Sequence, residues 1–130
     1  MPLVRISLPA GKPADYAERL SRGVHQALVD IFSVPADDYF QVLTEHAAGS
    51  GIARPASYLG VRYSADLVIV QITCSVGRSV DLKQALYARI ADNLTAATGL
   101  RREDIFISLV ESKREDWSFG NGIAQYVNAA

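Results

Sequence analysis

Apolar residues recur with two different spacings along this chain, and each spacing predicts one kind of element. Short apolar runs of six to eight residues, one of them nearly continuous, are typical of strands in a sheet that is covered on at least one face. The predicted strands are residues 3–8, 39–45, 67–74 and 105–111. The Gly-, Ala- and Ser-rich stretch 46–64 predicts a loop that contains one short strand near Tyr58–Val61.

Between the strands of each pair, apolar residues recur every three or four positions, which is the period of a helix with one buried face. The first helix is predicted to start near Pro13, a favoured first helical residue, and to run to about Phe32. The second is predicted to follow Ser79, a good N-cap, and to end before Gly99. The predicted buried positions are Ala17, Leu20, Val24, Leu28 and Ile31 in the first helix, and Leu82, Leu86, Ile90, Leu94 and Ala97 in the second.

The two strand–helix–strand units read as copies of one another. A shift of 66 residues, from Ile6 to Ile72, also aligns Asp38 with Asp104 without a gap. The same shift pairs Gly11 with Gly77, Leu20 with Leu86, Phe40 with Phe106 and Glu45 with Glu111. A helix between two strands of one sheet implies a parallel, right-handed crossover. The sequence therefore predicts an α/β fold, in which tandem βαβ units form a four-stranded sheet with two helices on one face.

We expect one domain over residues 1–130, with repeat units at about 2–46 and 66–111 and a C-terminal tail at 112–130. The tail contains several aromatic residues but no helical pattern. Helices on only one face leave the other face of the sheet apolar and uncovered, and a two-layer domain must bury it. We therefore expect that face to pack against other subunits, with the aromatic tail crossing to a neighbour.

Composition narrows the class of protein. The chain is 49% hydrophobic and 21% charged, which is typical of a globular domain, and its net charge of −1 argues against a nucleic-acid or anionic-membrane partner. No secretory signal is visible, and no apolar run reaches the roughly 18 residues of a membrane span. The single Cys74 reads as a buried apolar residue and fits a cytoplasmic location. His25 and His46 stand apart from other ligands, so no metal site is expected.

Pro2 is the first candidate for chemistry. If Met1 is removed, the Pro2 nitrogen becomes a free secondary amine, whose pKa of about 8 falls on burial or beside a cation. A neutral amine can take a proton from carbon or form an iminium ion with an aldehyde, and a protonated one can polarise a carbonyl oxygen. The structural alternative is that Pro2 is only the first residue of a strand, a position that tolerates proline.

Two charged residues are further candidates. Arg78 stands at the start of the second helix, where its guanidinium can bind a carboxylate through two parallel hydrogen bonds. The alternative is a solvated side chain, as for its repeat partner Lys12. Asp38 precedes a strand and pairs with Asp104 in the repeat, which suits a structural turn. Its functional interpretation is a carboxylate that orients water or balances charge on the terminal amine.

Four stretches, PLVRISL, VPADDYFQV, GRSVDLKQ and DWSFGNG, together resemble the tautomerase superfamily and, within it, the malonate semialdehyde decarboxylases. The resemblance implies a homotrimer with no metal and no organic cofactor. It implies that Pro2 is the catalytic amine, that Arg78 binds the substrate carboxylate and that Asp38 assists. Trp117 and Phe119 would wall the pocket, although aromatic residues of a tail also commonly pack on a partner surface.

The implied activity is that of a carbon–carbon lyase, a cofactor-independent decarboxylase of a short 3-oxo acid such as malonate semialdehyde. One alternative is keto–enol tautomerisation of a 2-oxo acid such as phenylpyruvate. Another is hydration or dehalogenation of 3-haloacrylates, since GRSVDLK is also similar to the cis-3-chloroacrylic acid dehalogenases. Some of the decarboxylases carry a second arginine where this chain has Val76. A non-catalytic trimeric binding protein is the alternative outside the enzymes, and a retained Met1 would favour it.

Overall fold

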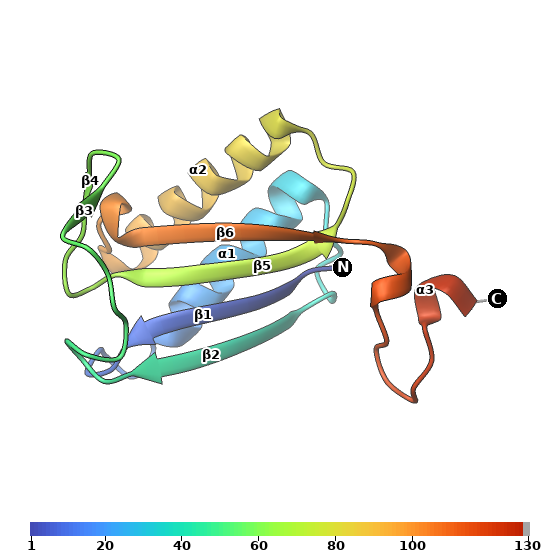
Figure 1. Cartoon of the computed structure of the whole chain (residues 1–130), viewed down its shortest axis with the longest axis horizontal. Helices are drawn as coiled ribbons and strands as arrows, with labels where there is room; N and C mark the ends of the chain where they lie inside the picture. Colours follow the sequence, from blue (N-terminus) through green and yellow to red (C-terminus); the bar gives the residue numbers. More distant parts are fainter. Residues whose placement is uncertain (129–130) are drawn as a thin grey trace.

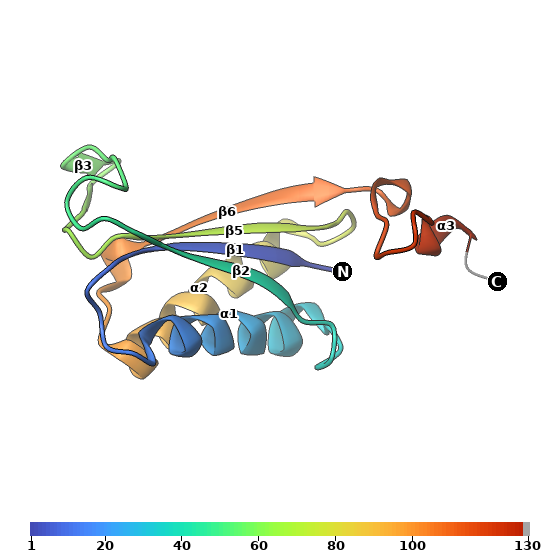
Figure 2. The same cartoon turned by 90° about the horizontal axis from the view of Figure 1, so that it is seen from below.

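The computed structural model describes residues 1–128 and shows one four-stranded sheet with two long helices on one face (Figures 1 and 2). The strand order is β2-β1-β5-β6, with β1 and β5 antiparallel and each outer strand parallel to its neighbour. This arrangement confirms the predicted tandem βαβ fold. The strands are β1 (Leu3–Pro9), β2 (Phe40–His46), β5 (Val68–Ser75) and β6 (Ile105–Ser112), and the helices are α1 (Tyr16–Phe32) and α2 (Val80–Thr98).

The pairing of the strands repeats at the same 66-residue shift as the sequence. Leu3 pairs with Phe40 in the first unit, and the equivalent Ile69 pairs with Phe106 in the second. Across the centre of the sheet, Arg5 pairs with Gln71, its own repeat partner. The two units are therefore related by an approximate twofold axis near that pair, and equivalent residues of β1 and β5 lie at opposite ends of the sheet.

The core lies between the sheet and the two helices. Alternate residues of β1 and β5 point at the helices and are buried, as the period of two requires. On the helices, Leu20, Val24 and Leu28 of α1 and Leu86, Ile90 and Leu94 of α2 are fully buried. Leu82 is 41% exposed, against expectation, because the first turn of α2 stands beyond the edge of the sheet (Figure 1).

The helix ends follow the predicted signals with one exception. The Ser79 side chain accepts a hydrogen bond from the Leu82 amide at 3.2 Å, and Gly99 ends α2 in the left-handed region with φ 75°. The start of α1 near Pro13 is wrong by about a turn. The Pro13 carbonyl closes a turn with the Tyr16 amide at 3.0 Å, and the helix begins only there.

The segment between the units forms a hairpin rather than one short strand. Strands β3 (Ser57–Tyr58) and β4 (Val61–Arg62) pair antiparallel around Leu59 and Gly60, whose φ values of 49° and 81° form the turn. The tail contains two short helical turns and extends past the end of the sheet, beside the N-terminus (Figure 1). These turns are η2 (Arg114–Asp116) and α3 (Gln125–Asn128). Another short turn, η1 (Arg102–Asp104), precedes β6. Tail residues 129–130 lie outside the described residues.

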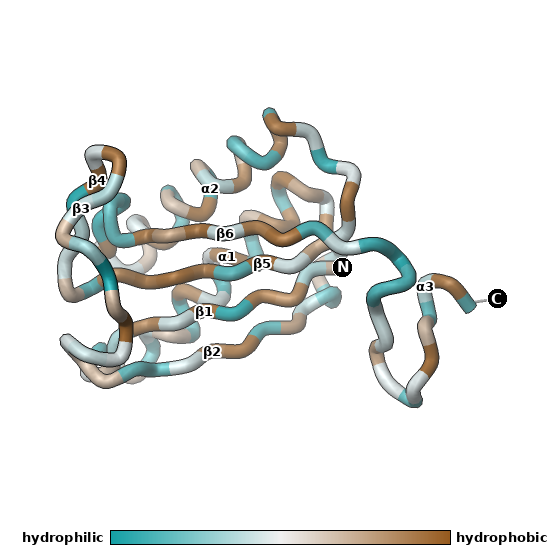
Figure 3. The backbone as a smooth tube through the Cα atoms, viewed as in Figure 1, coloured by the Kyte–Doolittle hydropathy of each residue, from teal (hydrophilic) through white to brown (hydrophobic). Residues whose placement is uncertain are grey.

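Apolar and polar residues alternate along the strands of the sheet (Figure 3), and both kinds lie on the face opposite the helices. Phe40 and Phe106 are 52% and 45% exposed on its outer strands. Arg5 and Gln71 are also exposed there and form a polar centre. The expectation of a simply apolar face is therefore wrong, because alternation within the apolar run of β5 places Gln71 outward. No helix within residues 1–128 has the length and apolar character to cross a membrane.

Candidate active site

The N-terminus, the turn before β2 and the tail meet at one end of the sheet and enclose two adjoining pockets. The larger has a volume of about 530 Å³, and the smaller about 290 Å³. Met1, Phe40 and Phe119 line both of them. The larger is completed by Leu3, Thr73, Ser112, Asp116, Trp117 and Ser118, and the smaller by Pro35, Asp37, Asp38 and Tyr126.

Pro2 is buried, directly before the strand pairing that starts at Leu3. The Met1 side chain is 6% exposed, so the first residue is packed into the site. Its α-amine lies 4.0 Å from Oδ2 of Asp38. The structure thus brings the chain's terminal nitrogen and the predicted carboxylate together.

Asp38 is held by its backbone, while its side chain keeps a free oxygen. Its amide donates to the Pro35 carbonyl at 3.0 Å, which closes the turn before β2. Oδ1 is buried and has no hydrogen-bond partner within the described residues. Burial raises the pKa of Asp38, the terminal amine opposes this effect, and the neighbouring Asp37 adds to it. A buried acceptor without a partner can accept a hydrogen bond from a ligand or an ordered water.

Aromatic side chains of the tail form one wall of the site. The rings of Trp117 and Phe119 are stacked with centroids 5.7 Å apart, and Tyr126 meets Phe119 edge-on at 4.9 Å. The Trp117 indole donates to Ser112 Oγ at 2.8 Å, and that hydroxyl donates to the Cys74 carbonyl at 3.2 Å. The wall is therefore tied to β5 and β6 of the same chain, and the expected crossing of the tail to a neighbour stays a prediction.

The tail loop is also closed on itself. The Gln125 side chain accepts from the Phe119 amide and donates to the Gly120 carbonyl, both at 2.9 Å. Arg114 donates to the Tyr126 carbonyl at 2.8 Å, with its guanidinium 5.0 Å from that ring. These contacts within the tail add to the bond that ties Trp117 to Ser112.

Arg78 lies at the same end of the sheet but is not among the residues that line these two pockets. It donates to the Ser75 carbonyl at 2.9 Å, and its guanidinium carbon lies 4.7 Å from the centre of the Phe32 ring. Its charge nevertheless reaches the pocket wall. Burial raises the pKa of Tyr126, with Asp38 adding to it, and both Arg114 and Arg78 oppose that rise.

Phe40, Tyr126 and Ser112 are among the site residues that were not singled out from the sequence. Phe40 lines both pockets, but in the sequence it is one more apolar residue of a strand. Tyr126 belongs to a tail with no periodic pattern that could give it a direction. Ser112 is buried and links Trp117 to β5, yet nothing in its neighbourhood marks it. Among residues 1–128, no three His, Cys, Asp or Glu side chains are placed to hold a metal ion.

Comparison with known proteins identifies close relatives over almost the whole chain. Two family models, each described as "Tautomerase enzyme", match residues 38–120 and 2–57. The chain is 39% identical to the probable tautomerase YusQ of Bacillus subtilis, over 98% of this chain and 99% of that one.

Solved structures of the same fold include two malonate semialdehyde decarboxylases. The FG41 enzyme, inhibited by 3-bromopropiolate, is 38% identical with a TM-score of 0.87, over 96% of this chain and 94% of that one. The second is 30% identical with a TM-score of 0.85, over 96% and 95%, and is described as having decarboxylase and hydratase activities. A fused 4-OT symmetric trimer, 21% identical with a TM-score of 0.76 over 97% and 98%, shares the fold.

Proposed function

The chain belongs to the tautomerase family of enzymes, and we propose that it is a cofactor-independent decarboxylase of a short 3-oxo acid such as malonate semialdehyde. One observation carries the proposal: beside an aromatic pocket, Oδ2 of Asp38 lies 4.0 Å from the amine of Met1, the residue before Pro2, and its Oδ1 is buried without a partner among the described residues. The likeness to two malonate semialdehyde decarboxylases over 96% of the chain supports it.

The catalytic group in this proposal is the Pro2 nitrogen, which is an amide while Met1 is attached. Met1 lines both pockets, and its side chain is 6% exposed. Its removal therefore frees the space that this side chain fills and leaves a secondary amine on Pro2, which is buried. A terminal amine at the start of a paired strand is held in one direction, which favours a fixed attack or proton-transfer geometry.

The reaction breaks the bond between the carboxylate carbon and the methylene carbon of malonate semialdehyde. The electron pair of that bond moves toward the aldehyde and forms the enolate of acetaldehyde as CO2 leaves. A protonated Pro2 amine polarises the aldehyde oxygen and stabilises the enolate. The enolate carbon then takes one proton from the Pro2 ammonium group, which gives acetaldehyde, and water returns a proton to the amine. Asp38, by its negative charge, keeps the amine protonated during the first step.

We assign substrate carboxylate binding to Arg78, and the walls of the pocket to Trp117 and Phe119. The role of Arg78 is supported by the likeness to the decarboxylases and by its place at the same end of the sheet, although it does not line the two pockets. Removing the positive charge of Arg78 in Arg78→Ala is expected to raise KM for the anionic substrate.

We further propose that the protein is a cytoplasmic homotrimer. The exposed phenylalanines of the outer sheet face would be covered by other subunits, and a protein of the same fold is a trimer. Sedimentation as a stable monomer at micromolar concentration would contradict the trimer.

The test compares two reactions on protein whose loss of Met1 is verified by intact mass. CO2 release from malonate semialdehyde is measured beside ketonisation of the enol of phenylpyruvate. Decarboxylation with the higher kcat/KM supports the proposal. Far more efficient ketonisation supports the second candidate, a 2-oxo acid tautomerase, which the name of the Bacillus relative favours. Hydration of a 3-haloacrylate is assayed alongside, and a Met1-retaining protein with none of these activities would be a binding protein.

A further inference from the structure

The turn that carries Asp38 is anchored to α1 on both of its sides. His25 Nε2 lies 2.9 Å from the Ala36 carbonyl oxygen, and because a carbonyl only accepts, this nitrogen is the donor. On the other side, the Tyr39 hydroxyl is hydrogen-bonded to Ser21 Oγ. The His25 and Tyr39 rings also meet edge-on, with centroids 4.4 Å apart and planes at 89°. Asp38 thus stands between two residues whose positions α1 determines.

The anchor continues into the sheet. Ser21 is 3% exposed, and its hydroxyl donates to Gln41 Oε1 at 2.6 Å. A serine hydroxyl has one hydrogen, so the Tyr39 hydroxyl is the donor in its bond to Ser21. Gln41 Nε2 returns a bond to the Ser21 carbonyl at 3.3 Å. The turn, α1 and β2 therefore form one connected network, and none of these bonds uses a carboxylate oxygen of Asp38.

The second repeat unit lacks this network. The residues at the positions of Ser21, His25 and Tyr39 there are Tyr87, Ala91 and Ile105. An alanine and an isoleucine side chain cannot make the corresponding hydrogen bonds. The equivalent aspartate, Asp104, is instead bound directly through its own oxygens. A carboxylate whose oxygens must stay free for chemistry cannot be held by hydrogen bonds to those oxygens. It can be held by hydrogen bonds to the residues on either side of it.

We infer that His25 and Tyr39 are positioning residues, which hold Asp38 toward the terminal amine while leaving its carboxylate free to act. This inference rests on the proposed function, because it concerns the same site. It differs from a purely structural role in what it predicts for kinetics. Displacing a catalytic carboxylate lowers kcat, whereas a substrate that still reaches the pocket keeps its KM.

The experiment uses the Met1-processed protein and four variants. His25→Leu removes the donor to Ala36, and His25→Gln restores a donor at nearly the same reach. Tyr39→Phe removes only the hydroxyl that bonds Ser21. Gln26→Leu is the matched control, since this exposed neighbour bonds only Asp30 on the same helix. We expect kcat to fall about 10- to 100-fold in His25→Leu and Tyr39→Phe with KM within about threefold. We expect His25→Gln and Gln26→Leu to stay near the original kcat.

A second readout does not depend on activity. The Asp38 amide, bonded to the Pro35 carbonyl, should lose protection from hydrogen exchange in His25→Leu and regain it in His25→Gln. Unchanged kcat in His25→Leu and Tyr39→Phe, or no recovery in His25→Gln, overturns the inference. If the unmodified protein turns over neither substrate, the proposed function fails. Hydrogen exchange then decides alone, and equal protection of Asp38 in His25→Leu overturns the positioning role.

Discussion

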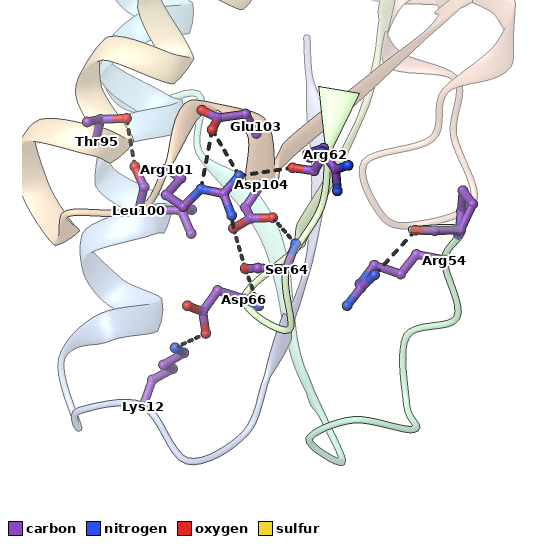
Figure 4. Close-up of polar contacts among 11 residues, drawn as sticks. Lys12, Arg54, Arg62, Ser64, Asp66, Thr95, Leu100, Arg101, Glu103 and Asp104 are labelled. Carbon is purple, nitrogen blue, oxygen red and sulfur yellow. Dashed lines mark hydrogen bonds and ion pairs between the residues drawn. The ribbon is translucent and has the colours of Figure 1, made fainter. Parts of the chain in front are cut away.

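Asp38 and Asp104 hold equivalent places in the two units, each just before the second strand, at opposite ends of the sheet. Asp104 is fully buried, and its oxygens accept bonds from the Ser64 amide at 2.8 Å and the Ser64 hydroxyl at 2.5 Å (Figure 4). Arg101 adds an ion pair at 3.7 Å. Asp38 has one buried oxygen with no partner in the described chain, and its other oxygen lies 4.0 Å from an amine. Both oxygens of Asp104 accept hydrogen bonds, whereas Asp38 can still accept hydrogen bonds from a ligand.

The difference follows from how the chain runs at each end. At the Asp104 end, the segment that leads into β5 supplies Ser64, and the Pro2 position is taken by Val68, whose nitrogen is an ordinary amide. At the Asp38 end, an amine faces the carboxylate. The pockets repeat as well, because Leu67, Ile69 and Phe106 line a pocket of about 390 Å³ and are the repeat partners of Met1, Leu3 and Phe40. The same scaffold thus holds a structural aspartate at one end and a candidate catalytic one at the other.

The largest expected effect comes from making the first end like the second. An N-terminal extension that is not cleaved would keep the Pro2 nitrogen in an amide bond, like the nitrogen of Val68. We expect kcat/KM for malonate semialdehyde to fall at least about 1000-fold, since an amide nitrogen is neither base nor cation. The thermal midpoint and sedimentation should stay unchanged. The same residues added after the last residue serve as the control, and full activity of the N-terminally extended protein would show that Pro2 is only a strand residue.

Asp38→Asn is expected to have the next largest effect, chiefly on activity. Replacing the carboxylate by an amide removes the charge that faces the amine but keeps the shape of the side chain. We expect kcat to fall about 100-fold, within the usual range for a group that assists proton transfer. Steady-state CO2 release measures it, and an undiminished kcat would mean that the free oxygen of Asp38 has no part in the reaction.

Asp104→Asn is expected to act on stability instead. The amide keeps one acceptor but loses the charge that Arg101 and Ser64 bind, and a donor is left without its partner. We expect the free energy of unfolding to fall by about 2–3 kcal/mol, the usual cost of breaking a buried hydrogen-bonded charge. Urea unfolding measures this loss, while kcat stays within about threefold of the original value. A large loss of activity at unchanged stability would contradict the assignment of the two ends.

The fold could be predicted well because its elements carry strong periodic signals. The alternation in β1 and the three- and four-residue spacing in α1 determine which faces are buried, and the 66-residue shift predicts the second unit from the first. The errors fall where local signals are ambiguous. A proline fits the first helical position and the preceding turn equally, so Pro13 did not mark the true start of α1. An apolar run does not show that the outward face of β5 has a polar centre at Gln71.

The candidate site was less predictable, because it joins residues that only packing brings together. Pro2 and Asp38 were candidates by their chemistry, and the tail aromatics came from the resemblance. In the structure, Asp38 and the tail aromatics line one pair of pockets, and Pro2 follows Met1, which lines both. The contacts that anchor Asp38 link α1 to the turn before β2 through His25 and Tyr39. No spacing of residues in the sequence predicts these contacts. The orientation of Arg78 toward Phe32 also depends on side-chain packing that a motif does not contain.

The smallest expected effect sharpens the comparison through pH. Burial raises the pKa of Asp38 above its unfolded value, so between the two values the folded state binds more protons than the unfolded state. The ionised carboxylate therefore costs stability, and that cost appears as pH rises through the window that starts near pH 4. Asp38→Asn has no such ionisation and should be slightly more stable than the parent protein at pH 7.

As the pH is lowered toward 4, the carboxylate of the parent protein takes up a proton, and the difference in thermal midpoint between the two proteins should shrink. Thermal unfolding of both proteins from pH 4 to 7 measures this difference, with Glu115→Gln, an exposed carboxylate of the tail, as the control. An Asp38→Asn protein less stable than the parent at pH 7, with the gap closing on acidification, would mean that the carboxylate is satisfied in the fold after all, and the two ends of the sheet would then hold their aspartates alike.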